Sequence, residues 1–197
     1  MHRVIHFFLL LPALALAACA AAPPPSPQAP AAPEGDPLAA FETVRTVLLH
    51  PRCLNCHPAG DVPMQGDKGA LHTQGVVRGA EGSGVAGLEC TSCHGRANLP
   101  DSYGPSQPPG VSSEWRMPRS DMKLVFAGLT PRALCQQLKD PARNGGKDLA
   151  ALFAHVDRDP LVLWGWKPGT GRAPVSVPHD VFAAAFTAWS QKGAPCP

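Results

Sequence analysis

Two copies of one short pattern constrain this chain more than any other feature of its sequence. The stretches "RCLNCHPAGD" and "GLECTSCHG" each contain C-x-x-C-H, which places two thiols and an imidazole within five consecutive residues. The side chains concerned are Cys53, Cys56, His57, Cys90, Cys93 and His94. With seven Cys and eight His in 197 residues, chance would give roughly 0.01 copies of this pattern. Such a pair of thiols can bind a zinc ion, form a disulfide or attach a haem.

Of these three chemistries, haem attachment accounts for every part of the pattern. A zinc ribbon also uses two C-x-x-C pairs, but four thiolates complete its ligand set and no His is needed after each pair. A dithiol redox site needs a single pair, normally within a thioredoxin-like βαβ unit, and no such unit is recognisable here. In c-type attachment the two thiols add to the vinyl groups of the porphyrin, and the following His binds the iron. The sequence therefore predicts two haem c groups, with His57 and His94 as iron ligands.

The first 36 residues predict export and a membrane tether rather than part of the fold. Residues 1–18 combine the basic Arg3 with an apolar run that is too short to span a bilayer of about 30 Å, as in a cleaved signal peptide. The letters "LAAC" resemble the lipobox of bacterial lipoproteins, which implies cleavage before Cys19 and acylation of its thiol. A plain secretory signal is the alternative. Residues 19–36 are mostly Ala and Pro, a linker that would reach about 50 Å.

These features predict a folded domain at 37–197 on the periplasmic side, held by lipid to the cytoplasmic or outer membrane. The last two cysteines, Cys135 and Cys196, are a candidate disulfide in that oxidising compartment. Two unpaired buried thiols are the alternative. Aromatic residues make up only 6% of the chain, while Gly and Pro number 19 and 24. A core this thin usually depends on disulfides or a cofactor.

Amphipathic patterns predict four helices within this domain. The first runs from Pro37 to about Leu49 and leads into the first C-x-x-C-H motif, and the last covers about 179–192. Thr130 and Pro131 are the N-cap and first turn of another helix. A further helix buries the following side chains: Leu149, Leu152, Phe153 and Val156. The Gly-rich stretch between the two motifs shows no periodicity and is expected to be a loop lying against haem.

With these features in place, the domain resembles a small di-haem cytochrome c. The two motif stretches, together with "QLKDPARNGG" and "WGWKPGTGR", are similar to bacterial proteins labelled isoquinoline 1-oxidoreductase subunits. This resemblance covers most of the domain. It implies a mainly α fold in which cytochrome c-like helices and long loops wrap around two covalently bound haems. It also implies a molybdenum hydroxylase as redox partner.

Each iron also needs a sixth ligand, and here the sequence leaves alternatives open. For the first iron we favour His72 over Met64, and an open or water-bound position is the third possibility. For the second iron the candidates are Met122 and Met117. Met117 precedes Pro118, as in the distal loop of mono-haem cytochromes c, whereas the spacing from Trp115 in the resembling proteins favours Met122.

The other histidines have structural interpretations. We expect His50 to end the first helix, His155 to be solvated and His179 to cap the last helix. Trp164 and Trp166 are expected to be core anchors rather than an electron relay.

The expected function is a relay of single electrons between a periplasmic oxidoreductase and the respiratory chain. Nothing in the sequence indicates a second chemistry such as a Ser/His/Asp arrangement or a phosphate-binding loop, so we expect an electron-transfer protein without a small-molecule substrate. The net charge of +2 and the absence of a basic stripe argue against nucleic acid as a partner. The alternative is a di-haem peroxidase or a haem sensor with one five-coordinate iron.

Overall fold

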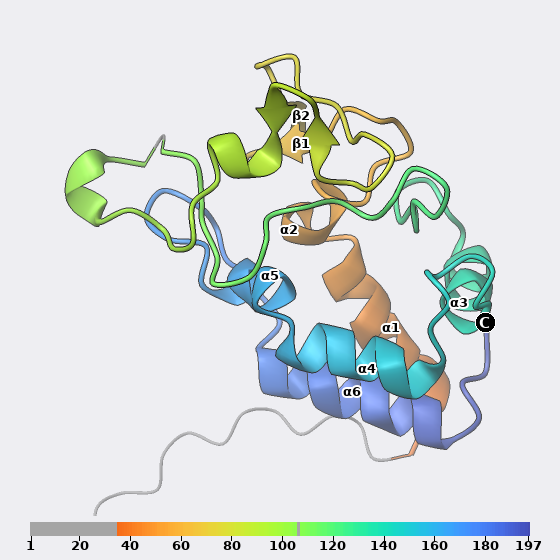
Figure 1. Ribbon diagram of the computed structural model, residues 1–197. Helices are drawn as coiled ribbons and strands as arrows, with labels where there is room; N and C mark the ends of the chain where they lie inside the picture. The colour runs from red at the N-terminus through yellow and green to blue at the C-terminus, as the bar shows by residue number, and fades with distance from the viewer. Residues whose placement is uncertain (1–34, 106) are drawn as a thin grey trace, which may run out of the picture.

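Helices form most of the regular structure, and the only sheets in the described part of the chain are two short hairpins (Figure 1). This computed structural model describes residues 35–105 and 107–197. Its helices are α1 (Pro37–Leu48), α2 (Pro51–Leu54), α3 (Pro131–Lys139), α4 (Leu149–Arg158), α5 (Pro160–Leu163) and α6 (His179–Gln191). The predicted helical class is thus confirmed. The signal peptide at 1–18, the anchor at Cys19 and nearly all of the 19–36 linker lie outside the described residues.

The first and last helices pack against each other and form the centre of the core. Asp36 caps α1 by accepting a hydrogen bond from the Leu38 amide at 2.8 Å, and Pro37 occupies the first turn. One face of α1 is buried against α6, and Phe41 contacts Trp189 with ring centroids 5.3 Å apart. The buried residues of the two helices are Ala40, Phe41, Val44, Val47, Leu48, Phe182, Ala185, Phe186 and Trp189. Both helices were predicted with nearly these bounds.

Three further helices complete this half of the molecule. The Thr130 hydroxyl caps α3 by accepting from the Ala133 amide at 3.1 Å, and the Asp148 carboxylate caps α4 in the same way. A disulfide joins Cys135 of α3 to Cys196 at the end of the chain, as the sequence predicted. The disulfide therefore fastens the C-terminal tail to the helical core.

The chain between the two motifs is more regular than the sequence indicated. Instead of one loop it forms two antiparallel hairpins, β1 (Met64–Gln65) with β2 (Ala70–Leu71) and β3 (Gly84–Val85) with β4 (Leu88–Glu89). Gly79 approaches this second hairpin so closely that a Cβ there would lie 1.9 Å from the Gly84 carbonyl oxygen, and its φ is +67°. Only glycine fits this position. Each strand has only two residues, which is too short for the alternation of apolar and polar residues that would reveal a strand in the sequence.

The two halves of the fold lie at opposite ends of the molecule. Figure 1 shows α1, α4 and α6 layered together at one end, with the hairpins and α2 at the other. No helix in the described ranges is long and apolar enough to cross a membrane.

Candidate functional site

The first C-x-x-C-H motif begins in α2, the short helix that follows α1. The His57 amide donates to the Cys53 carbonyl at 3.2 Å, so the thiol and the imidazole lie one helical turn apart. The His57 Nδ1 lies 2.8 Å from the Leu124 carbonyl oxygen, and Phe126 stacks on the imidazole at a centroid distance of 4.2 Å. Because a carbonyl can only accept, Nδ1 must carry the proton. Nε2 is then left with a free lone pair, the form in which His binds a metal.

The second motif repeats this arrangement on a different part of the chain. Cys90 opens a 3-10 turn, η1 (Cys90–Ser92), and the His94 amide donates to the Cys90 carbonyl at 2.9 Å. The His94 Nδ1 lies 2.8 Å from the Pro109 carbonyl oxygen, so Nε2 is again the free nitrogen. Trp115 stacks face to face on this imidazole, with centroids 4.4 Å apart and planes inclined by 2°. Carbonyls from two different loops thus contact the Nδ1 atoms of the two imidazoles in the same way.

Burial shifts the pKa values of several motif side chains toward the neutral form. It raises the pKa of the Cys53 thiol to about 12 and lowers the pKa of His57 to about 4. Burial also lowers the pKa of His94. Neutral imidazole is the form that a metal requires.

The two motifs lie close to each other in space. Burial raises the pKa of the Cys56 thiol to about 11, and the negative charge of a Cys90 thiolate adds to this shift. Cys56 and Cys90 are therefore within electrostatic range of one another, although 34 positions separate them in the sequence.

Aromatic contacts also join the two motifs. Trp164 meets Trp115 edge to face at 5.1 Å, and the Arg52 guanidinium lies 5.7 Å from the Trp164 ring. Arg52 directly precedes Cys53. The sequence predicted Trp164 as a core anchor. In the structure it lies between Arg52, beside the first motif, and Trp115, which stacks on His94 of the second.

Arg78 is a buried arginine beside the first motif that the sequence analysis missed. Its side chain is fully buried and donates to the Pro118 carbonyl at 2.8 Å, to the Gly60 and Pro58 carbonyls at 3.0 and 3.2 Å, and to the Asp61 carboxylate at 3.3 Å. It holds the chain that follows the first motif against the loop after Met117. An Arg in a Gly-rich stretch carries no local signal for such a role.

The structure places His72 differently from the sequence prediction, which assigned it to the first iron. Its ring centroid lies 6.3 Å from that of His94 in the second motif, with planes inclined by 58°. The His72 Nδ1 is buried and has no hydrogen-bond partner among the described residues. The His72 ring therefore lies beside the imidazole of the second motif.

Two of the methionine candidates, Met122 and Met117, lie close in sequence to residues that contact the motif imidazoles. Met122 is two residues from Leu124, the residue that holds His57 from behind. Met117 is buried two residues after Trp115, and its amide donates to the Gly82 carbonyl at 2.8 Å.

The remaining methionine, Met64, lies in β1 opposite Leu71. Its Cε comes within 2.9 Å of where a Gly69 Cβ would be, so its side chain packs on its own hairpin.

Three histidines differ from their sequence interpretations. His50 does not end α1 but caps α2, where its Nδ1 accepts from the Arg52 amide at 3.2 Å. His179 opens α6 without capping it, and its Nε2 lies 3.2 Å from the Val156 carbonyl oxygen. His155 is half-buried and its Nδ1 lies 3.0 Å from the Asp159 carboxylate, rather than being free in solvent.

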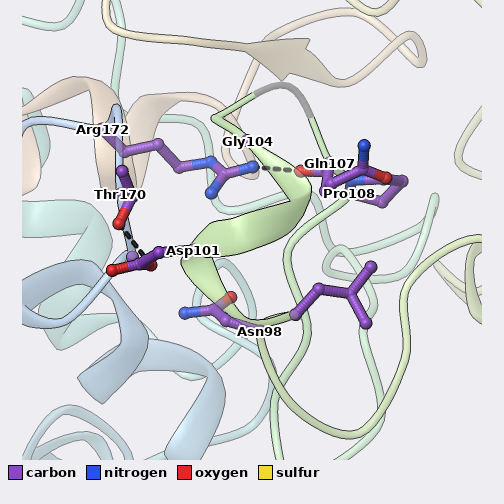
Figure 2. A pocket seen from close by; sticks show the side chains of 9 residues that line it. Asn98, Asp101, Gly104, Gln107, Pro108, Thr170 and Arg172 are labelled. Carbon is purple, nitrogen blue, oxygen red and sulfur yellow. Dashed lines mark hydrogen bonds between the residues drawn. The ribbon is translucent and has the colours of Figure 1, made fainter.

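Two hollows lie in the described part of the chain, and both are small. Figure 2 shows one at the junction of the loop after the second motif and the loop after Trp166, where Arg172 bonds to Gln107 and Thr170 to Asp101. Its volume of about 10 Å³ fits one water molecule. A second hollow of about 150 Å³ borders Asp159.

Within residues 35–105 and 107–197, no three His, Cys, Asp or Glu side chains gather into a group that could hold a metal ion by themselves. A haem iron is a different kind of site, because the porphyrin supplies four nitrogens and the protein only one or two. Each motif offers the side chains such a group needs: two thiols and an imidazole with a free Nε2. Comparisons of the chain with protein-family models, with curated proteins and with solved structures return no match.

Proposed function

We propose that this protein is an exported, lipid-anchored di-haem cytochrome c that relays single electrons between a periplasmic oxidoreductase and the respiratory chain. One observation carries the proposal: in both motifs the Nδ1–H of the His after the second Cys donates a hydrogen bond to a backbone carbonyl at 2.8 Å. This contact fixes the tautomer that directs Nε2 to an iron and increases the basicity of the ligand. A zinc or disulfide site at the cysteines would not require it.

The chemistry of the haem would be the gain and loss of one electron at iron, without atoms exchanged with a substrate. Cys53, Cys56, Cys90 and Cys93 would anchor the two groups through four thioethers, and the Leu124 and Pro109 carbonyls would hold the imidazoles of His57 and His94. The resemblance to isoquinoline 1-oxidoreductase subunits suggests a molybdenum hydroxylase as electron donor.

The proposal is tested by producing the full chain in cells that carry out c-type haem maturation. We expect two haems per chain in a pyridine haemochrome assay, haem staining that survives denaturing electrophoresis, and uptake of two electrons in a reductive titration. The matched variant Cys90→Ala/Cys93→Ala should carry one haem. A processed, exported and colourless protein without iron would refute the proposal. Labelling with a fatty acid that is lost in Cys19→Ala tests the anchor separately.

A further inference from the structure

We propose that His72 and His94 bind the same iron, the one attached through Cys90 and Cys93, on its two opposite faces. The proposal rests on the proposed function and deepens it, because it assigns a sixth ligand. It also moves His72 from the first motif to the second and leaves Met122 and Met117 without a ligand role at that iron.

The separation of the two rings is the first argument. A metal–nitrogen bond of about 2.0 Å, plus roughly 1.1 Å from the nitrogen to the ring centre, puts two imidazoles on opposite faces of one metal about 6.2 Å apart. The observed centroid distance between His72 and His94 is 6.3 Å. Rings in direct contact lie closer, as the 4.4 Å between His94 and Trp115 shows. The tilt of 58° is no obstacle, because each imidazole can turn about its bond to the metal.

The unpaired nitrogen of His72 is the second argument. Leaving a buried nitrogen without a partner costs about 1–3 kcal/mol. His72 has such a nitrogen, its buried Nδ1. A buried imidazole nitrogen without a partner, in a ring held at this distance from a second imidazole, has the properties of a metal ligand.

The backbone holds His72 firmly in this position. It follows β2 directly, and its amide donates to the Pro63 carbonyl at 2.9 Å across the β1–β2 hairpin. A ligand on a hydrogen-bonded hairpin is more precisely placed than one on a free loop.

The test for His72 counts high-spin irons in the oxidised protein by electron paramagnetic resonance and near-infrared magnetic circular dichroism. The wild type should show one low-spin iron with two imidazoles, the iron attached through Cys90 and Cys93. In His72→Ala this iron should become high-spin and bind carbon monoxide when reduced, and added imidazole should restore its low-spin spectrum. The matched control Met122→Leu should leave the spectrum of this iron unchanged.

Two backgrounds identify the iron that His72 serves. The change should appear when only the second haem remains, as in Cys53→Ala/Cys56→Ala, and be absent in Cys90→Ala/Cys93→Ala. Two low-spin irons in the di-haem His72→Ala protein, or a change confined to the first haem, would overturn the proposal. A haemochrome assay on the same samples separates this failure from that of the proposed function, since the haem content is unaffected by the sixth ligand.

Discussion

Removal of the disulfide should cost this protein a large part of its stability. Cys135 and Cys196 are 61 residues apart in sequence. In the chain-entropy model, closing a loop of this length lowers the entropy of the unfolded chain by about 14 cal/mol/K, or about 4 kcal/mol at 25 °C. The double variant Cys135→Ala/Cys196→Ala tests this value. Alanine is preferable to serine at position 135, because that side chain is fully buried and a hydroxyl there would need a partner.

The measurement is urea unfolding followed by circular dichroism at matched haem content. We expect the free energy of unfolding to fall by about 4 kcal/mol, while the secondary structure is retained. The tail keeps two other attachments, from Trp189 Nε1 to the Pro195 carbonyl at 3.0 Å and from Lys139 Nζ to the Ala194 carbonyl at 2.8 Å. The control is wild-type protein treated with a thiol reductant, which should lose nearly the same stability. A loss below about 1 kcal/mol with an unchanged urea dependence would refute the reasoning.

Two other substitutions test the surroundings of the motifs. Gly110→Ala would place a Cβ 2.2 Å from the Ala97 carbonyl oxygen and so displace the neighbouring Pro109 carbonyl that holds His94. The midpoint potential of one haem should then rise in a redox titration. The control Gly60→Ala, whose Cβ would meet no atom within 4 Å, should leave both midpoint potentials unchanged. Arg78→Met strands buried carbonyls and should lower the free energy of unfolding by about 3–5 kcal/mol, whereas Arg119→Met, at an exposed ion pair, should change it by less than about 1 kcal/mol in the same urea assay.

The helices were predictable because their signals are local. The side chains of Asp36, Thr130 and Asp148 each cap a helix by accepting from a backbone amide two or three residues further on, and the apolar stripes of α1 and α6 repeat at helical spacing. The disulfide followed from counting cysteines in a chain predicted to be exported, since only two remained after the motifs and the predicted lipid anchor.

The positions of the ligand candidates were not predictable, because contacts between distant residues decide them. The carbonyl that holds His57 belongs to Leu124, 67 residues away. His72 lies nearer in sequence to the first motif, at 15 residues, than to the second, yet its hairpin turns it toward His94. The Asp159 partner of His155 was overlooked, although four residues along a helix place two side chains on one face.

The high pKa values of the first thiol pair bear on the order of assembly under the proposed function. Thioether formation needs a reactive sulfur, and burial in the folded chain raises the pKa of the Cys53 thiol to about 12 and that of the Cys56 thiol to about 11. An enzyme system that attached haem at these thiols would therefore have to act before this part of the chain folds. Folding would then close over a bond already made.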